Sequence, residues 1–212
     1  MSLAAGFNRL APFYDILAQL GSFGEIKRLH SRAAKLIFNT SKVLVIGGGT
    51  GHFAKPIIEQ LQSPTLYIDW VDFSEAMLDK AKKNLSEFNA INYYHQDFTN
   101  FLQETKKPSY DLVISCFALD IVTPQNKLNL CIQNINYALH NEGSLLLLDF
   151  KPLNQGGFMQ KKLMLKFFEY AVNSQLKVIP NLNKLVLKNG FKVQKGIDQR
   201  LTFAKLYKKE HA

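Results

Sequence analysis

The chain of 212 residues has only two cysteines, Cys116 and Cys131, which lie far apart and show no metal-ligand spacing. Such sparse use of cysteine excludes a disulfide framework and predicts two free thiols in a reducing compartment, with no metal site. No uninterrupted aliphatic run exceeds four residues, whereas a membrane-spanning helix needs about 20. The N-terminus has no basic region followed by an apolar run, so it does not resemble a secretory signal. These absences together predict a cytoplasmic protein.

Acidic residues are scarce at the C-terminal end. Residues 1–150 carry 13 basic and 14 acidic side chains, whereas residues 151–212 carry 13 and 3. This asymmetry indicates either a lysine-rich solvated face or an anionic partner, such as an acidic lipid surface. Nucleic acid is not favoured, because Arg200 is the only arginine of this segment and no aromatic residues alternate with the basic ones. Peripheral membrane contact through the basic C-terminal part stays open.

Repeats, low-complexity stretches and Pro/Gly/Ser-rich linkers are also missing. Hydrophobic residues make up 47% of the chain and charged residues 20%, which is the composition of a globular protein. A chain of this length can bury a substantial core as one compact domain. Residues 3–38 are typical of two helices broken near Gly21–Gly24, and we interpret residues 1–40 as a helical cap on a main domain of residues 41–212.

Short apolar runs alternate with helical segments along the rest of the chain. The predicted strands are 42–47, 65–72, 91–96, 110–115, 143–150, 191–197 and 200–208. The predicted helices are 51–61, 74–88, 124–140, 158–173 and 180–189. Near-continuous apolarity in the first five runs is typical of parallel strands covered on both faces. The last two runs are separated only by Asp198 and Gln199, which predicts an antiparallel hairpin. The pattern predicts an α/β fold, Rossmann-like and doubly wound, with a mostly parallel seven-stranded sheet and helices on both faces.

The most informative stretch is GGGTG at Gly47 to Gly51, between a buried strand and a helix. Glycines let the backbone turn tightly and approach a ligand, and a helix N-terminus offers free N–H groups. A purely structural turn is the alternative. Asp72, at the end of the next strand, can accept hydrogen bonds from both hydroxyls of a ribose, or it can cap the following helix, a role that Ser74 can also fill. Asp97 can meet an adenine amine, or it can be a turn residue.

Five segments, VLVIGGGTG, VDFSEAML, HQDF, YDLVISCFAL and LHNEGSLLLLDF, resemble in order and spacing the motifs of class I S-adenosylmethionine-dependent methyltransferases. The resemblance covers about residues 40–150 and 180–209. It implies that S-adenosylmethionine is the cofactor, that Asp72 holds its ribose and that Met77 packs on its adenine. The cofactor-binding residues that it implies are Tyr14, Gly47, Gly49, Gly51, Asp72, Phe73, Met77, Asp97, Phe98 and Ser115. A shorter likeness, with Tyr14-Asp15 as its "YD" element, is to the ubiquinone/menaquinone-biosynthesis C-methyltransferase branch.

One position departs from the family pattern. An acidic residue usually stands two positions before the first glycine and helps to orient the methionyl amine, and here that position is Val45. A non-catalytic adenosyl-binding or partner-binding domain therefore stays as an alternative. An NAD(P)-dependent oxidoreductase is disfavoured, because the last glycine of G-x-G-x-x-G falls on His52.

Methyl transfer is an in-line displacement that needs positioning and exclusion of water, and a base only where the acceptor loses a proton. The segment SCFALDIVT predicts that Cys116, Phe117 and Asp120 lie near the acceptor. Asp120 is the candidate base, although it can also be a cap or turn before Pro124. Tyr14 and His30 are further candidates that can equally be core residues. The segment SCFA also lacks the (N/D)PPY motif of enzymes that methylate amines of nucleic-acid bases.

A predicted helix after Gly156-Gly157 carries apolar residues that can cover a hydrophobic acceptor, namely Phe158, Met159, Leu163, Phe167 and Tyr170. Its lysines, Lys161, Lys162 and Lys166, are expected to face solvent or an anionic surface. An ordinary core helix is the alternative. The sequence therefore predicts a methyltransferase acting on a small or lipid-like organic acceptor, and it does not indicate the oligomeric state.

Overall fold

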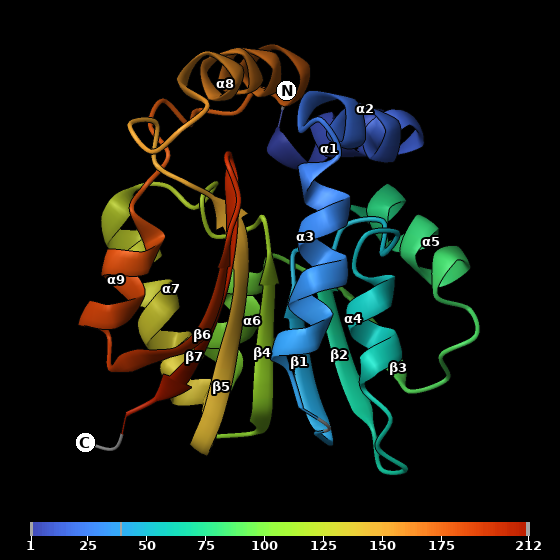
Figure 1. Cartoon of the computed structure of the whole chain (residues 1–212). Helices are drawn as coiled ribbons and strands as arrows, with labels where there is room; N and C mark the ends of the chain where they lie inside the picture. Colours follow the sequence, from blue (N-terminus) through green and yellow to red (C-terminus); the bar gives the residue numbers. More distant parts are fainter. Residues whose placement is uncertain (1, 39, 211–212) are drawn as a thin grey trace.

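The structure is a computed structural model that describes residues 2–38 and 40–210. Its centre is a seven-stranded sheet with the order β3-β2-β1-β4-β5-β7-β6 (Figure 1). The strands are β1 (Lys42–Ile46), β2 (Tyr67–Asp72), β3 (Ile91–His95), β4 (Tyr110–Cys116), β5 (Leu139–Phe150), β6 (Phe191–Asp198) and β7 (Thr202–Lys209). Strands β1 to β5 pair in parallel, and β7 pairs antiparallel with both β5 and β6. The predicted fold class, with its C-terminal hairpin, is confirmed.

Helices cover both faces of this sheet and one of its ends (Figure 1). They are α1 (Leu3–Leu10), α2 (Tyr14–Gly21), α3 (Glu25–Ala33), α4 (Lys55–Gln60), α5 (Glu75–Asn84), α6 (Phe98–Glu104), α7 (Gln125–Ala138), α8 (Phe158–Val172) and α9 (Leu182–Lys188), with the 3-10 turns η1 (Ala11–Phe13) and η2 (Ala34–Leu36). Helices α3, α4 and α5 pack on one face, and α6, α7 and α9 on the other. Helices α1, α2 and α8 lie across the end of the sheet.

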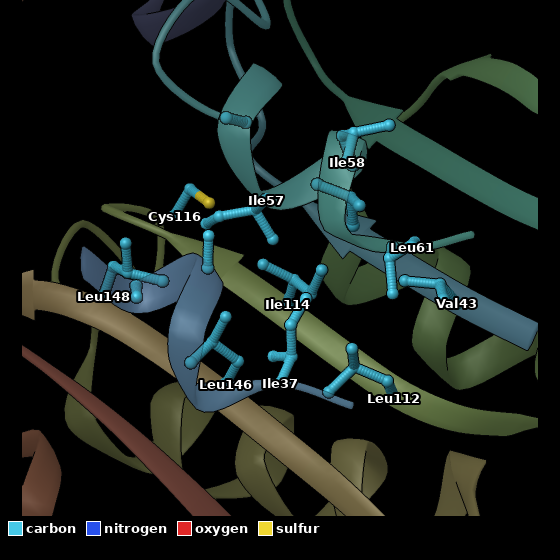
Figure 2. Packing of buried hydrophobic residues seen from close by; sticks show 14 of the residues in the cluster. Ile37, Val43, Ile57, Ile58, Leu61, Leu112, Ile114, Cys116, Leu146 and Leu148 are labelled. Atoms are coloured by element: carbon cyan, nitrogen blue, oxygen red, sulfur yellow. The ribbon is translucent and has the colours of Figure 1, made fainter. Parts of the chain in front are cut away.

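The two faces are built by the alternation of side chains along each strand. Along β1, Val43 and Val45 belong to one hydrophobic cluster, whereas Leu44 and Ile46 belong to the other. Figure 2 shows the first cluster, with Ile57 and Ile58 of α4 above the side chains of β4 and β5. Because both faces of the central strands β1, β2 and β4 are buried, these strands need apolar residues at most positions, which is why their sequence runs are nearly continuous.

The N-terminal segment breaks where predicted, at Ser22–Gly24, but it contains three helices rather than two. Pro12 lies in η1, where its missing N–H ends the hydrogen-bond pattern of α1. Helix α3 contributes Leu29 and Ala33 to the core, whereas α1 and α2 lie at the end of the sheet. The division into a cap of residues 1–40 and a main domain of residues 41–212 stays a prediction.

Two features of the structure differ from the sequence analysis. Helix α6 was not predicted, although its N-cap Asp97 accepts hydrogen bonds from the backbone N–H and the hydroxyl of Thr99. The expectation that Lys161 faces solvent is wrong, since only 1% of this residue is exposed. Its ammonium donates to the carbonyl oxygens of Lys151, Pro152 and Gln155, which replace the water that a buried cation loses. Lys161 therefore ties α8 to the loop that follows β5.

In the described ranges, no helix has the length and apolarity that crossing a membrane requires.

Candidate functional site

The glycine-rich loop leaves β1 with Gly47, Gly49 and Gly51 in the left-handed region, at φ +62°, +57° and +74°. A Cβ on Gly47 would lie 2.3 Å from the Cβ of Ala118, so the loop packs too closely on the segment after β4 for any side chain. A Cβ on Gly49 would meet no atom within 4 Å. The backbone at Gly49 therefore faces open space, as a ligand-binding loop requires.

Asp72 joins this loop to the end of β2. Its Oδ2 accepts a hydrogen bond of 3.0 Å from the Gly49 N–H, and its Oδ1 accepts one of 2.9 Å from the Ser74 N–H. Burial raises the pKa of Asp72 to about 6, against the lowering effect of these two hydrogen bonds. Each oxygen keeps a lone pair, so the carboxylate can still accept two hydroxyl groups.

Ser74 fills the capping role that was the alternative for Asp72. Its Oγ accepts a hydrogen bond of 3.3 Å from the Met77 N–H at the start of α5, and it donates one of 2.7 Å to Asn8 Oδ1 in α1. Ser74 thus caps α5, and Asp72 is not needed for this role. The second bond also fixes α1 over the carboxyl end of β2.

A small cavity of about 40 Å³ lies at these strand ends. It is lined by Phe7, Tyr14, Gly47, Gly49, Asp72, Phe73, Met77, Phe98, Cys116, Phe117, Ala118 and Ile121. The structure thus brings seven of the ten predicted cofactor residues to one place. Phe7, which sequence reasoning missed, also lines this cavity, with its ring centroid 5.5 Å from that of Phe73 and 6.3 Å from that of Tyr14.

Three of the predicted cofactor residues lie outside the lining. Gly51 packs on α5, where a Cβ would lie 2.8 Å from Leu85 Cδ1. Ser115 is fully buried, and its hydroxyl has no hydrogen-bond partner among the described residues. Asp97 caps α6, and its Oδ2 lies 3.7 Å from Lys127 Nζ. Their roles toward a cofactor stay predictions.

A second, larger cavity of about 500 Å³ adjoins the first. It is lined by Leu10, Tyr14, Leu17, Ala18, Leu20, Gly21, Ser22, Phe23, Ile26, Phe117, Phe150, Gln160, Leu163, Met164, Phe167 and Phe168. Almost all of these side chains are apolar, and they come mainly from α2, the loop after it and α8. Tyr14 and Phe117 line both cavities, so the two spaces meet at these side chains.

Phe117 stands at the junction in a strained backbone conformation, with φ +51° in the left-handed region. Its N–H donates to the Leu148 carbonyl oxygen, and its ring packs edge-on against Phe150 at 4.8 Å between centroids. The ring of His30 stacks with the ring of Phe117 at 5.9 Å between centroids. These contacts fix the ring of Phe117 between the two cavities.

Tyr14 reaches the same junction from α2. Burial, and then the nearby carboxyl groups of Asp120 and Asp72, raise the pKa of its phenol above the ordinary value. The phenol therefore stays protonated and can donate a hydrogen bond into the site. The adjacent Asp15 anchors α2 to the glycine-rich loop, since its Oδ1 accepts a hydrogen bond of 2.5 Å from the Thr50 hydroxyl.

Asp120, the candidate base, lies in neither cavity lining and is 4% exposed. Burial raises its pKa to about 7, and burial together with Asp120 raises the pKa of Asp149 well above its ordinary value. Among the described residues, Asp120 Oδ1 and Asp149 Oδ2 have no hydrogen-bond partner. A general base must reach the proton it removes, so the catalytic role of Asp120 stays a prediction that this geometry does not favour.

His30 is a core residue in the structure. Its Nδ1–H donates a hydrogen bond of 2.8 Å to the Ile26 carbonyl oxygen, and burial lowers the pKa of the imidazole to about 4. Val45 is fully buried and pairs with Trp70 of β2. The small cavity therefore has Asp72 as its only acidic lining residue in the described part of the chain.

The strand order, the glycine-rich loop after β1 and the carboxylate at the end of β2 define the fold of class I methyltransferases. A solved S-adenosylmethionine-dependent methyltransferase from Thermotoga maritima matches with a TM-score of 0.69 at 18% identity, covering 99% of this chain and 100% of that chain. The N-methyltransferase NodS from Bradyrhizobium japonicum, solved with S-adenosyl-L-homocysteine, matches with a TM-score of 0.65 at 12% identity, covering 88% and 87%. At these identities the likeness concerns the fold.

The sequence comparisons point in the same direction as the fold. Residues 44–145 match a family model described as a methyltransferase domain. Malonyl-[acyl-carrier protein] O-methyltransferase 1 from Ilyobacter polytropus is 31% identical over 123 residues, which is 58% of this chain and 43% of that protein. Demethylmenaquinone methyltransferase from Thermotoga maritima is 28% identical over 159 residues, which is 73% and 64%. The chain thus spans less than two thirds of the length of these relatives. Residues 44–145 thus resemble the methyltransferase domain of S-adenosylmethionine-dependent enzymes, whose cofactor is S-adenosylmethionine.

Proposed function

We propose that this chain is an enzyme that transfers the methyl group of S-adenosylmethionine to a small or lipid-like organic acceptor. The observation that carries the proposal is the junction at Tyr14 and Phe117, where the large apolar cavity meets the cavity of the glycine-rich loop. An acceptor in the first space and a cofactor in the second would meet at these two side chains.

The residues around the small cavity fit the cofactor. Asp72 offers two buried carboxylate oxygens for the ribose hydroxyls, and open space at Gly49 lets the chain backbone lie against the methionyl part. Met77 and Phe98 supply apolar surface for an adenine ring. When bound, S-adenosylmethionine supplies an electrophilic methyl group on a sulfonium. Because about 40 Å³ is room for little more than one water, Phe7 has to swing away when the cofactor enters.

The large cavity fits an apolar acceptor. Its volume of about 500 Å³ falls within the range of small-molecule sites, which are mostly apolar with a few placed polar groups. Tyr14, Ser22 and Gln160 are the polar side chains of its lining. We assign Tyr14 to orient the acceptor, because it lines both cavities and its phenol stays protonated, and Phe117 and Phe150 to exclude water there. Two relatives are named for demethylmenaquinone and for malonyl-[acyl-carrier protein], which supports an organic acceptor.

A second candidate is a non-catalytic domain that binds the adenosyl cofactor without turnover. Val45 favours it, because this buried residue stands where the family usually has the acid that orients the methionyl amine. No other acid besides Asp72 lines the described small cavity in compensation. A turnover assay distinguishes the two candidate functions, since both predict that the chain binds the cofactor.

The test has two stages. Calorimetric titration with S-adenosylhomocysteine, beside NAD and NADP, is expected to give micromolar binding of the first ligand alone. Transfer of labelled methyl from S-adenosylmethionine is then measured on a panel of phenolic, quinol and fatty acyl acceptors. Met164→Trp, which fills the large cavity, should abolish transfer and leave S-adenosylhomocysteine binding intact, whereas Val193→Trp on the exposed side of β6 should change neither. Binding without transfer to any acceptor supports the non-catalytic candidate, and no binding rejects both.

A further inference from the structure

Helix α8 exposes an apolar stripe along one side. Met159, Leu163 and Tyr170 are 79%, 71% and 89% exposed, and their spacings of four and seven residues place them on one face of a helix. Three large apolar side chains this open to solvent in one stripe are uncommon unless the stripe has a partner. The structure shows no element of the described chain that covers them.

This stripe lies between two other faces of α8. On one side Gln160, Met164 and Phe167 line the large cavity, and Leu163 belongs to both the stripe and the lining. On the other side lie Lys162 and Lys166, one helical turn apart. Around the helix, the apolar stripe therefore lies between the face that lines the cavity and the face that carries the two lysines.

The opposite rim of the cavity comes from α2 and the loop after it. Leu20 and Phe23 line the cavity and are each 68% exposed, while Phe13 and Ile16 nearby are each 63% exposed. Figure 1 shows α2 and α8 at the same end of the molecule, beyond the ends of the strands. Exposed apolar side chains thus border the mouth of the cavity from both helices.

The charges around this mouth are of one sign. Asp15, the only ionisable residue of α2 besides Tyr14, is turned toward Thr50 and Lys80. Glu169, the only acid of α8, pairs with Lys177. Lys162 and Lys166 form no ion pair with any described residue, and Lys162 Nζ lies 4.7 Å from the centroid of the Phe158 ring. The apolar rim therefore carries free positive charge and no free negative charge.

We propose that this surface, which we define as Leu20, Phe23, Met159, Leu163 and Tyr170 with Lys162 and Lys166, docks on an anionic lipid bilayer. The apolar side chains would enter the boundary between headgroups and acyl chains, and the lysines would contact the lipid phosphates, as in interfacial amphipathic helices. The mouth of the cavity then opens toward the acyl region. A lipid-like acceptor reaches the cavity without crossing water, a consequence that rests on the proposed function.

Sedimentation of the whole chain with vesicles tests the docking. The chain is expected to sediment with vesicles of phosphatidylcholine and phosphatidylglycerol, and much less with phosphatidylcholine alone. Met159→Ser/Leu163→Ser and, separately, Lys162→Gln/Lys166→Gln should each weaken binding roughly tenfold. The matched controls on β6, Val193→Ser and Lys192→Gln/Lys195→Gln, change an exposed apolar residue and a lysine pair of the same chain and should leave binding unchanged. All of these positions are exposed in the structure, which keeps the fold intact in each variant.

Three results would overturn the proposal. The first is no sedimentation with anionic vesicles, and the second is an equal loss in the β6 controls, which would indicate general attraction to the basic C-terminal part. The third is a vesicle-independent dimer that the Met159→Ser/Leu163→Ser change converts to monomer, which would make the surface an interface between copies. Vesicle binding uses neither cofactor nor acceptor, whereas S-adenosylhomocysteine titration uses no lipid. Failure of the docking and failure of the proposed function are therefore separate results.

Discussion

The hydroxyl of Thr50 donates a hydrogen bond of 2.5 Å to Asp15 Oδ1, which joins the glycine-rich loop directly to α2. Lys80 of α5 lies 3.5 Å from the other oxygen of the same carboxylate. Asp15 thus holds α2, which lines the large cavity, against the glycine-rich loop. This hydrogen bond links α2 to the glycine-rich loop, although the two residues lie 35 positions apart in the sequence.

The first prediction concerns this contact. Asp15→Ala removes an acceptor that is largely shielded from water, and it should weaken S-adenosylhomocysteine binding about three- to tenfold, because α2 and the loop lose their mutual support. Asp15→Asn keeps an oxygen for the Thr50 hydroxyl and loses only the charge opposite Lys80, so most of the affinity should return. Calorimetry measures the affinity, and hydrogen exchange of α1 and α2 reports the loosening. Equal affinity in the alanine and wild-type chains would show that the contact is only structural.

The second prediction concerns Asp72. Asp72→Ala leaves two ribose hydroxyls without their acceptor and should cut S-adenosylhomocysteine affinity tenfold or more. Glu75→Gln, an acid-to-neutral change at the exposed start of α5, is the control and should bind normally. A folded Asp72→Ala chain with unchanged affinity would refute the assignment of this residue.

The pH dependence of the same carboxyl group is a third prediction. Burial raises the pKa of Asp72 to about 6, and only the ionised group can accept a hydrogen bond at both oxygens. Affinity for S-adenosylhomocysteine should therefore be full above pH 7 and should fall as the pH drops through about 6. Calorimetric titrations from pH 5 to pH 8 follow the change. A flat affinity profile from pH 5 to pH 8 would mean that the carboxyl group titrates outside this pH range or that it does not contact the ligand.

Local signals in the sequence were enough for much of the fold. The seven strands, the loop at Gly47–Gly51 and the Ser74 cap were predicted, because each depends on residues that are close together in the chain. Helix α6 was missed because seven residues give too few turns for a clear apolar period, although Asp97 before Thr99 is a capping signal that could have indicated it.

The arrangement of the site was less accessible from sequence. Tyr14 and Phe117 are each recognisable as site candidates, but that they line the same junction depends on how α2 packs on the segment after β4. Lys161 looks like any other lysine of α8, and only the path of the loop from Lys151 to Gln155 brings three carbonyl oxygens to its ammonium. Contacts between distant segments decide both cases, and periodicity carries no information about them.

A fourth prediction concerns Phe7, which lines the small cavity. Because the cofactor cannot enter about 40 Å³, its association should wait for the Phe7 ring to move. Phe7→Ala should raise the association rate of S-adenosylhomocysteine several-fold, and it should also raise the dissociation rate, since the ring covers the bound ligand. Stopped-flow fluorescence of the single tryptophan, Trp70, which packs under Gly48, offers a signal. An association rate identical to that of the wild-type chain would show that α1 is open in solution.

The last prediction concerns the buried carboxyl pair of Asp120 and Asp149. Burial raises both pKa values, that of Asp120 to about 7, so the native chain binds protons that the unfolded chain has already released above about pH 4. The free energy of unfolding should therefore fall as the pH rises from about 4 to about 7. Asp120→Asn removes one ionisation and relieves the repulsion of the other, so it should be more stable than the wild-type chain at pH 8 and nearly equal to it at pH 4. Urea unfolding at a series of pH values measures this difference, with the exposed Asp79→Asn as control. If the stability of the wild-type chain does not fall between pH 4 and pH 7, the two carboxyl groups are ionised in the native chain, and a cation or ordered water must neutralise or solvate them.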